Sequence, residues 1–179
     1  MANTFMTAHT ASGQETSNSK ADNRAGKYLT FQLGTEEFGI RIMQVREIIG
    51  VQDITSVPQT PAYVRGVINL RGKVTPVISL RMKFGMPAIE NTQRTCIIVV
   101  QVQGENGKVL LGALVDGVTE VANLAAADIE DTPDFGGTVS LPYILGMAKT
   151  KGRVIILLDI DAALNAEELI GIEGAVRAL

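Results

Sequence analysis

Apolar and polar residues follow one another along this chain in short runs that end at glycine, proline or small polar residues. Residues 27–33 (KYLTFQL) alternate between the two kinds, and residues 37–42 (EFGIRI) do so again after a Gly-Thr-Glu turn, which predicts a β-hairpin. In residues 43–49 the apolar positions recur at three- and four-residue spacing instead. We therefore expect a short amphipathic helix there, which ends at Gly50.

The most apolar run of the chain lies near its middle. Residues 95–102 (TCIIVVQV) are mostly β-branched, as in a strand that is covered on both faces. An Asn-Gly turn follows, and residues 108–121 resume the strand pattern with bulges or sharp bends expected at Gly112 and Gly117, which predicts a second hairpin. A last buried strand is expected at residues 153–158 (RVIILL).

Two further strands are predicted on either side of a basic turn. Residues 66–70 and 73–80 have the strand pattern, and Arg71 and Gly72 lie between them. Pro76 lacks the N–H that a central strand would use, so we expect the second of these strands at an edge or at a bulge.

The remaining segments have weaker patterns. Residues 1–26 are rich in Ser, Thr, Ala and Asn without any period, which indicates a disordered tail; the alternative is an arm that becomes ordered on a partner. Residues 128–143 are expected to be mostly loop, and residues 161–170 to be helical up to Gly171. Many short strands with few helices predict a mainly β fold, either a barrel or a sandwich, and no internal repeat is visible in the sequence.

Composition and charge narrow the class of protein. With 179 residues, 46% of them apolar and 20% charged, the chain has the composition of one globular domain or one tight pair. The formal net charge of −3 argues against a nucleic-acid partner. Neither a secretion signal nor an apolar run of membrane-spanning length is present, so we expect a cytoplasmic protein without membrane insertion.

Candidate catalytic residues are few. Cys96 lies in the most apolar run, where an inert buried thiol is a better interpretation than a nucleophile, and His9 lies in the predicted tail. One cysteine and one distant histidine do not make a metal site, so no cofactor or metal is expected. Four carboxylates at predicted strand ends could pair in space, but solvated faces or hairpin ends are the better interpretation: Asp116, Glu120, Asp159 and Asp161.

The segment from Gly66 to Gly72 (GVINLRG) has an unusual arrangement of charge. Arg71 emerges from a mainly apolar strand between flanking glycines, which suits recognition of a partner; an arginine that merely extends to solvent at a strand end is the alternative. We expect a carboxylate to hold its guanidinium in a partly buried position. Glu47 is the first choice for that carboxylate, with Glu120 and Asp116 as alternatives.

Several separated motifs resemble one family. The segments TFQLGTEEFGI, VREIIG, VPQTPAYVRGVINLRGKVTPVISLR, VDGVTEV and RVIILLDID occur in an order that is very similar to that of the CheW-type coupling proteins of bacterial chemotaxis. The similarity extends from about Lys27 to Glu168. The regulatory domain of the chemotaxis histidine kinase shares these motifs, as do docking proteins with a receiver domain, but 179 residues leave no room for a kinase or receiver region.

The resemblance implies a fold and a function. It implies a tail (1–26) followed by a CheW-like domain (27–179) of two intertwined, SH3-like, five-stranded β-barrels with short helices, the last of them C-terminal. It also implies a protein without enzymatic activity that couples the cytoplasmic tips of transmembrane chemoreceptors to the regulatory domain of the histidine kinase in membrane-associated arrays. The alternative is an SH3-like protein-binding module of a different sensory or motility pathway.

Site residues follow from the same resemblance. The arginine of NLRG, the acidic residue of VREII and the basic residue before GV correspond to Arg71, Glu47 and Arg65. With their neighbours, the predicted partner-binding residues are Arg71, Glu47, Arg65, Gly66, Asn69, Val45 and Ile48.

Overall fold

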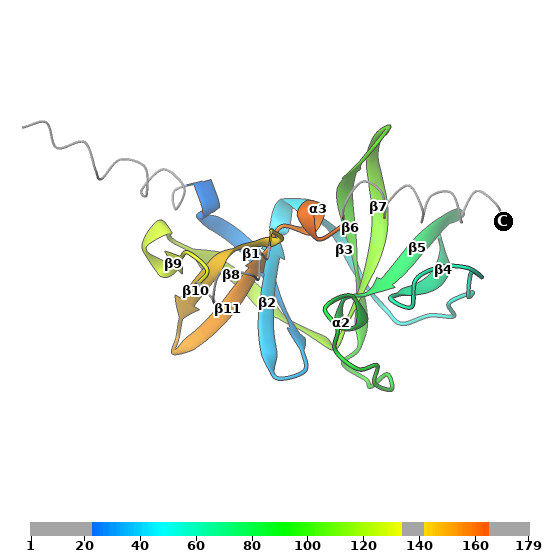
Figure 1. Cartoon of the computed structure of the whole chain (residues 1–179), viewed down its shortest axis with the longest axis horizontal. Coiled ribbons are helices and arrows are strands. Elements are labelled where there is room, and N and C mark those ends of the chain that lie inside the picture. Colours follow the sequence, from blue (N-terminus) through cyan, green and yellow to red (C-terminus); the bar gives the residue numbers. More distant parts are fainter. Residues whose placement is uncertain (1–22, 134–141, 165–179) are drawn as a thin grey trace, which may run out of the picture.

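The computed structural model describes residues 23–133 and 142–164, which form two β-sheets side by side (Figure 1). The helical elements that lie wholly within the described residues are single turns: η1 (Ile42–Gln44), α2 (Leu80–Lys83), η2 (Ala126–Asp128) and α3 (Ile160–Ala163). The predicted mainly β class is therefore confirmed. Within the described ranges, no helix has the length and apolar character needed to cross a membrane.

Each sheet is assembled from strands that are far apart in the sequence. The first sheet has the order β8-β1-β2-β11-β10-β9 and the second the order β3-β6-β7-β5-β4. Strands of the first sheet are β1 (Gly26–Leu33), β2 (Glu36–Arg41), β8 (Gly117–Leu124), β9 (Ile129–Glu130), β10 (Ile144–Thr150) and β11 (Arg153–Leu158). Strands of the second sheet are β3 (Val45–Gly50), β4 (Val64–Leu70), β5 (Lys73–Ser79), β6 (Cys96–Gly104) and β7 (Gly107–Val115).

The two sheets share one pattern of strand pairing, with two-residue β9 as the additional strand of the first sheet. Along β8-β1-β2-β11-β10 the successive pairs are antiparallel, antiparallel, parallel and antiparallel, and along β3-β6-β7-β5-β4 they are the same. The β1–β2 hairpin comes directly before β3, β4 and β5 of the second sheet in the sequence, but it pairs in the first sheet. The β6–β7 hairpin comes directly before β8 of the first sheet, but it pairs in the second sheet. The two sheets are thus intertwined, as the resemblance implies.

The shared pattern extends to individual residues eighty positions apart. The N–H of Ser79 donates to the carbonyl of Tyr63 at 2.7 Å, and the N–H of Asp159 donates to that of Tyr143 at 2.8 Å. Ser79 and Asp159 each cap the short helix that follows, α2 or α3, with a side-chain oxygen. The chain therefore contains a structural repeat. This repeat is not visible in the sequence, because few of the equivalent side chains are identical.

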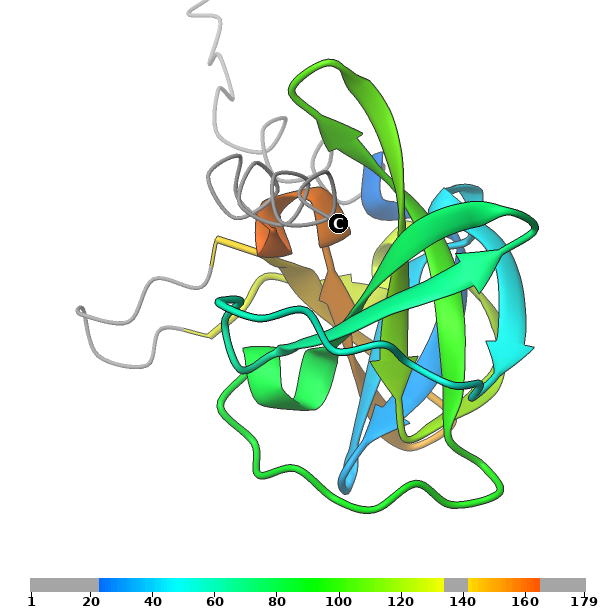
Figure 2. The same ribbon diagram turned by 90° about the vertical axis from the view of Figure 1, so that its right-hand side faces the viewer.

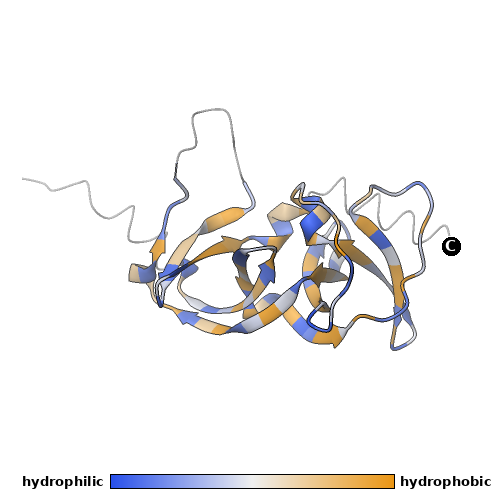
Figure 3. Cartoon of the chain, turned by 90° about the horizontal axis from the view of Figure 1, so that it is seen from below, coloured by the Kyte–Doolittle hydropathy of each residue, from blue (hydrophilic) through white to orange (hydrophobic). Residues whose placement is uncertain are grey.

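Apolar residues of both sheets pack into one shared cluster. Stacked rings connect Phe31 to Phe38 at 5.9 Å, Phe38 to Phe84 at 5.9 Å and Phe84 to Tyr143 at 5.2 Å between centroids. Phe31 and Phe38 belong to the first sheet, whereas Phe84 follows α2, beside the second. Along the strands, apolar bands alternate with polar ones, so one face of each sheet is available for this packing (Figure 3).

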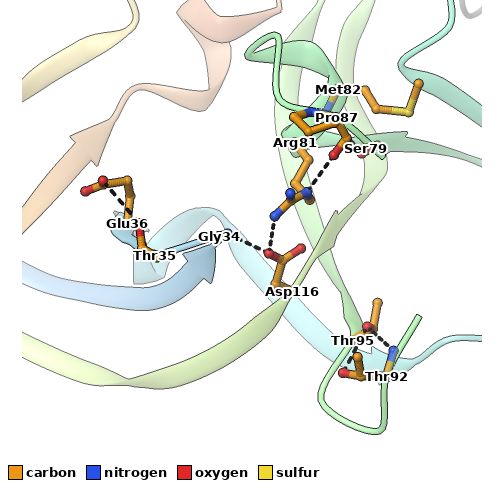
Figure 4. A network of polar contacts seen from close by, with 10 residues as sticks. All are labelled: Gly34, Thr35, Glu36, Ser79, Arg81, Met82, Pro87, Thr92, Thr95 and Asp116. Atoms are coloured by element: carbon orange, nitrogen blue, oxygen red, sulfur yellow. Dashed lines mark hydrogen bonds and ion pairs between the residues drawn. The ribbon is translucent and has the colours of Figure 1, made fainter. Parts of the chain in front are cut away.

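Asp116 joins the two sheets at the point where the chain passes from β7 to β8 (Figure 4). Its Oδ2 accepts hydrogen bonds from the guanidinium of Arg81 in α2 and from the N–H of Gly34 in the β1–β2 turn, both at 2.6 Å. The side chains of Arg81 and Asp116 are 11% and 18% exposed. One carboxylate therefore fixes elements of both sheets with little access of water.

Four expectations need correction. Residues 45–50 form strand β3 rather than a helix, because pairing with buried β6 outweighs the helical spacing of four apolar residues. Strand β5 is interior, and Pro76 is tolerated because pairing with β7 begins only at Val77. The run 108–121 is broken at Asp116 into two strands in different sheets.

The fourth correction concerns the end of the predicted tail. Residues 23–26 belong to the folded part, since the hydroxyl of Tyr28 donates to the carbonyl of Arg24 at 2.6 Å and β1 begins at Gly26. Two predicted segments lie outside the described residues: residues 1–22 of the tail, with His9 among them, and most of the predicted C-terminal helix.

Replacing Asp116 by alanine should destabilise the protein by roughly 2 to 4 kcal/mol, because it leaves the poorly hydrated guanidinium of Arg81 without its carboxylate. Chemical denaturation measures this change. Glu36→Ala is the control: among the described residues its carboxylate accepts a hydrogen bond only from the exposed hydroxyl of Thr35, at 3.5 Å, so a change within about 0.5 kcal/mol is expected. Equal effects of the two substitutions would contradict the role of Asp116.

Candidate functional site

A tight turn places Arg71 at the tip of the β4–β5 hairpin. Leu70 pairs with Lys73, so Arg71 and Gly72 are the two turn residues, and their φ angles are 50° and 82°. Positive φ at both positions is typical of a type I′ turn, which fits the twist of two antiparallel strands. Because an arginine rarely adopts this conformation, the turn needs local support, which Asn69 gives by accepting the N–H of Gly72 at 2.8 Å.

The guanidinium of Arg71 is held by both oxygens of Glu47. Its Nη1 lies 2.8 Å from Oε1 and its Nη2 lies 2.7 Å from Oε2, so the predicted pairing with Glu47 is confirmed. Arg71 comes from the hairpin that ends the second sheet on one side, and Glu47 comes from β3 at its other edge. The ion pair therefore links β3 to the β4–β5 hairpin, and the backbone pairing of Thr55 with Val67 joins the segment after β3 to β4 as well. Figure 2 shows the ribbon of the second sheet from this side.

The predicted partial burial of Arg71 is wrong. Its side chain is 77% exposed, whereas that of Glu47 is only 22% exposed. An exposed pair of this kind contributes about 1 kcal/mol or less to folding. The pairing with Glu47 instead holds the guanidinium of Arg71 in one orientation at the surface.

Strand β3 presents the other predicted residues of this region. Val45 is half-buried against the shared apolar cluster, and the strand has a register irregularity between Val45 and Glu47. Ile48 is 46% exposed, so an apolar side chain lies in solvent next to Glu47 in the sequence. The structure brings together Arg71, Glu47 and Asn69, with Val45 and Ile48 on the same strand as Glu47.

Arg65 and Gly66 lie at the opposite end of β4. The Nη1 of Arg65 contacts the sulfur of Met82 in α2 at 3.7 Å, away from the hairpin tip. Gly66 has φ +139°, and a Cβ at this position would collide with the carbonyl of Thr55, which pairs with Val67. Close approach of a backbone therefore accounts for this glycine.

A hollow of about 680 Å³ opens beside the ion pair, and most of the residues that line it were not predicted from the sequence. It is lined by, among others, Arg46, Glu47, Leu70, Arg71, Lys73 and Lys108. Lys108 comes from β7, which pairs with β6 and β5, and it lines the hollow together with residues of β3 and of the β4–β5 hairpin. Nothing in the spacing of these residues along the sequence indicates that they share one surface.

The first sheet has an equivalent hairpin, in which Lys151 and Gly152 have φ angles of 50° and 73°. Here the Nζ of Lys151 lies 3.6 Å from the carboxylate of Glu120, and Arg153 binds Glu120 at 2.7 Å and Glu37 at 3.0 Å. The hydrogen bond from Arg153 and the charge of Lys151 lower the pKa of Glu120. Two glutamates thus neutralise this hairpin.

Cys96 has the properties of a structural thiol. It is half-buried at the start of β6, and this burial raises its pKa against the opposing hydrogen bond from the backbone of Val118. Across the described residues, no group of three or more His, Cys, Asp or Glu side chains is placed to hold a metal ion.

Comparisons with known proteins agree with the motifs. The family model described as "CheW-like domain" matches residues 27–168. The chemotaxis protein CheW of Klebsiella aerogenes is 36% identical over 85% of this chain and 89% of its own length. That of Rhizobium meliloti is 38% identical over 82% and 92%. A solved structure, the scaffolding protein TtCheW from Thermoanaerobacter tengcongensis, is 32% identical and covers 80% of this chain and 95% of its own, with a TM-score of 0.68.

Gly66→Ala should lower the free energy of unfolding by more than about 2 kcal/mol, because the new Cβ meets a backbone carbonyl and the φ angle disfavours alanine. Denaturant titration tests this expectation. Gly50→Ala is the matched control, since its Cβ would meet open space and its φ is not positive, and a change below about 0.5 kcal/mol is expected. A stable Gly66→Ala protein would show that the glycine serves another purpose.

Alkylation of Cys96 should be slower than that of free cysteine at pH 8, because a raised pKa leaves a smaller fraction of thiolate at that pH. Iodoacetamide consumption followed between pH 7 and 10 measures this, with Cys96→Ala as the blank. That variant should lose about 1 kcal/mol of stability at most. A rate at pH 8 above that of free cysteine would identify an activated thiol and refute the structural interpretation.

Proposed function

The chain belongs to the CheW-like family, and on this basis we propose that it is a non-catalytic adaptor that couples chemoreceptors to the chemotaxis histidine kinase. The proposed partners are the cytoplasmic tips of the receptors and the regulatory domain of the kinase. The adaptor acts in the cytoplasm, where it is recruited to receptor arrays at the membrane. Its contribution is positional: ligand occupancy at a receptor reaches the kinase through two protein interfaces.

One observation carries this proposal, namely the exposed guanidinium at the tip of the β4–β5 hairpin. Arg71 is held in place by Glu47 and by the turn that Asn69 supports, so little side-chain freedom remains to be lost on binding. Arginines in fixed positions are frequent among the residues that dominate binding energy at protein interfaces. We assign Arg71, Glu47, Asn69 and the exposed Ile48 to one partner-binding surface, with Val45 supporting β3 beneath it.

Arg65 and Gly66 are the remaining predicted residues. The close approach of the Thr55 backbone accounts for Gly66, and we propose Arg65 as part of a separate surface. It is exposed on β4 and lines a hollow beside α2 together with Arg81 and Asp116. Because an adaptor must hold two partners at once, two surfaces at opposite ends of β4 suit its role. The similarity to chemotaxis proteins and to a solved scaffolding protein supports this role.

Arg71→Ala should leave the fold intact and weaken binding of one partner by at least tenfold, whereas Glu47→Ala, which only releases the arginine, should cause a smaller loss. A double-mutant cycle on partner binding should give a coupling energy on the order of 1 kcal/mol, because the two side chains contact each other. Surface plasmon resonance with receptor and kinase fragments measures the binding of the original chain, the two single variants and the double variant.

Lys151→Ala is the matched control for this cycle. Lys151 occupies the equivalent turn position with the same φ of 50°, so alanine imposes the same backbone cost there. Binding by Lys151→Ala should remain within about twofold of the original chain. Additive effects of Arg71→Ala and Glu47→Ala would argue against the pairing, and unchanged binding by a folded Arg71→Ala protein would remove the functional assignment.

A further inference from the structure

The hollow beside the Arg71–Glu47 pair carries an excess of positive charge. Four cationic side chains line it, Arg46, Arg71, Lys73 and Lys108, with Glu47 beside them. Glu47 neutralises Arg71, and none of the ion pairs among the described residues involves Arg46, Lys73 or Lys108. Three uncompensated positive charges therefore face one hollow on a chain whose net charge is −3.

The equivalent hairpin of the first sheet has the same backbone arrangement without an excess of positive charge. Lys151 corresponds to Arg71 and Arg153 corresponds to Lys73, but there Glu120 and Glu37 neutralise both cations. The same backbone framework thus carries a neutral cluster on one sheet and a basic hollow on the other. Unpaired like charges that lie close together repel one another, so they stabilise neither sheet nor turn.

The hollow also offers apolar contacts and an unused hydrogen-bond acceptor. Leu70 and Leu110 lie among the cations and are only half-buried. Gln101 lines the same hollow, and its Oε1 is buried without a hydrogen-bond donor, which is costly unless a donor reaches it. A smaller hollow continues the surface past Arg46, Gln101 and Lys108 to the exposed Met43. Asp161 also lines this smaller hollow, where its carboxylate accepts hydrogen bonds from the side chain of Gln44 and the N–H of Gln103.

We propose that this basic hollow binds an acidic, amphipathic stretch of the receptor's cytoplasmic tip, whose carboxylates meet Arg46, Lys73 and Lys108 while its apolar side chains contact Leu70 and Leu110. The proposal rests on the adaptor function proposed above and names the chemistry of one of its two interfaces. A volume of about 680 Å³ accommodates several side chains of a helix or extended segment, not a folded domain.

The size of the hollow favours the receptor rather than the kinase as the source of this stretch. It accommodates side chains of one exposed segment, not the surface of a folded domain such as the regulatory domain of the kinase. Attraction between unpaired cations and carboxylates should also increase the association rate, and it should weaken as salt is added.

The test uses the full chain, a soluble fragment of a receptor tip and the isolated kinase regulatory domain. Lys73→Glu and Lys108→Glu each leave the Arg71–Glu47 pair in place, and Lys27→Glu makes the same charge change at an exposed site on β1 in the first sheet. Stopped-flow and equilibrium binding are measured at 50 and 500 mM NaCl.

Each reversal at the hollow should weaken binding of the receptor fragment by roughly five- to tenfold at 50 mM NaCl, mostly through slower association, and by less than about twofold at 500 mM. Lys27→Glu and binding of the regulatory domain should change less than about twofold. A Glu→Lys change in the receptor fragment should restore the affinity of at least one of the reversed variants, which a general loss of structure would not allow.

Other outcomes overturn the inference and identify what replaces it. If the reversals weaken the kinase arm alone, the acidic partner is the kinase. If they abolish a salt-sensitive self-association seen by analytical ultracentrifugation, the hollow binds a second copy. If the unmodified chain binds both fragments, Arg71→Ala weakens one of them and the reversals change nothing, the acidic-partner inference fails while the adaptor function stands. Binding of neither fragment by the unmodified chain would instead refute the adaptor function.

Discussion

Exchange of hairpins between the two halves of the chain is the constraint on which the rest of this structure depends. The β1–β2 hairpin supplies two interior strands of the first sheet, and the β6–β7 hairpin supplies two interior strands of the second. Neither sheet forms from one continuous stretch of sequence, so the two are expected to fold together. The aromatic stack from Phe31 to Tyr143 and the carboxylate of Asp116 then fix their relative positions.

The ion pairs at the two equivalent hairpin tips leave different net charges on the two sheets. On the first sheet, Lys151 and Arg153 are paired with two glutamates, so these four side chains carry no net charge. On the second sheet a single glutamate holds Arg71, and three nearby cations take part in no ion pair with the described part of the chain. A repeated scaffold whose charges diverge in this way can present two unlike surfaces from one fold, which is what an adaptor between unlike partners requires.

Local features of the sequence were predicted well where the pattern was regular. The hairpins at β1–β2 and β6–β7, the buried strand β6 and the strand β11 follow from alternation, β-branched runs and turn residues. The pairing of Arg71 with Glu47 was also predicted, although it came from the family resemblance and from the need of a guanidinium for a carboxylate. Strand β3 was missed because four apolar residues fit a helical period, and only contact with β6 decides between helix and strand.

The sequence by itself determined where the chain turns, which runs are buried and which motifs place it in its family, since these depend on neighbouring residues. Tertiary structure alone decided which hairpins are exchanged, the structural repeat and the exposure of Arg71. It also decided that Arg46, Lys73 and Lys108 share one hollow, because strands from residue 45 to residue 115 contribute to it. Pairing between strands distant in sequence depends on packing and register, which no local pattern specifies.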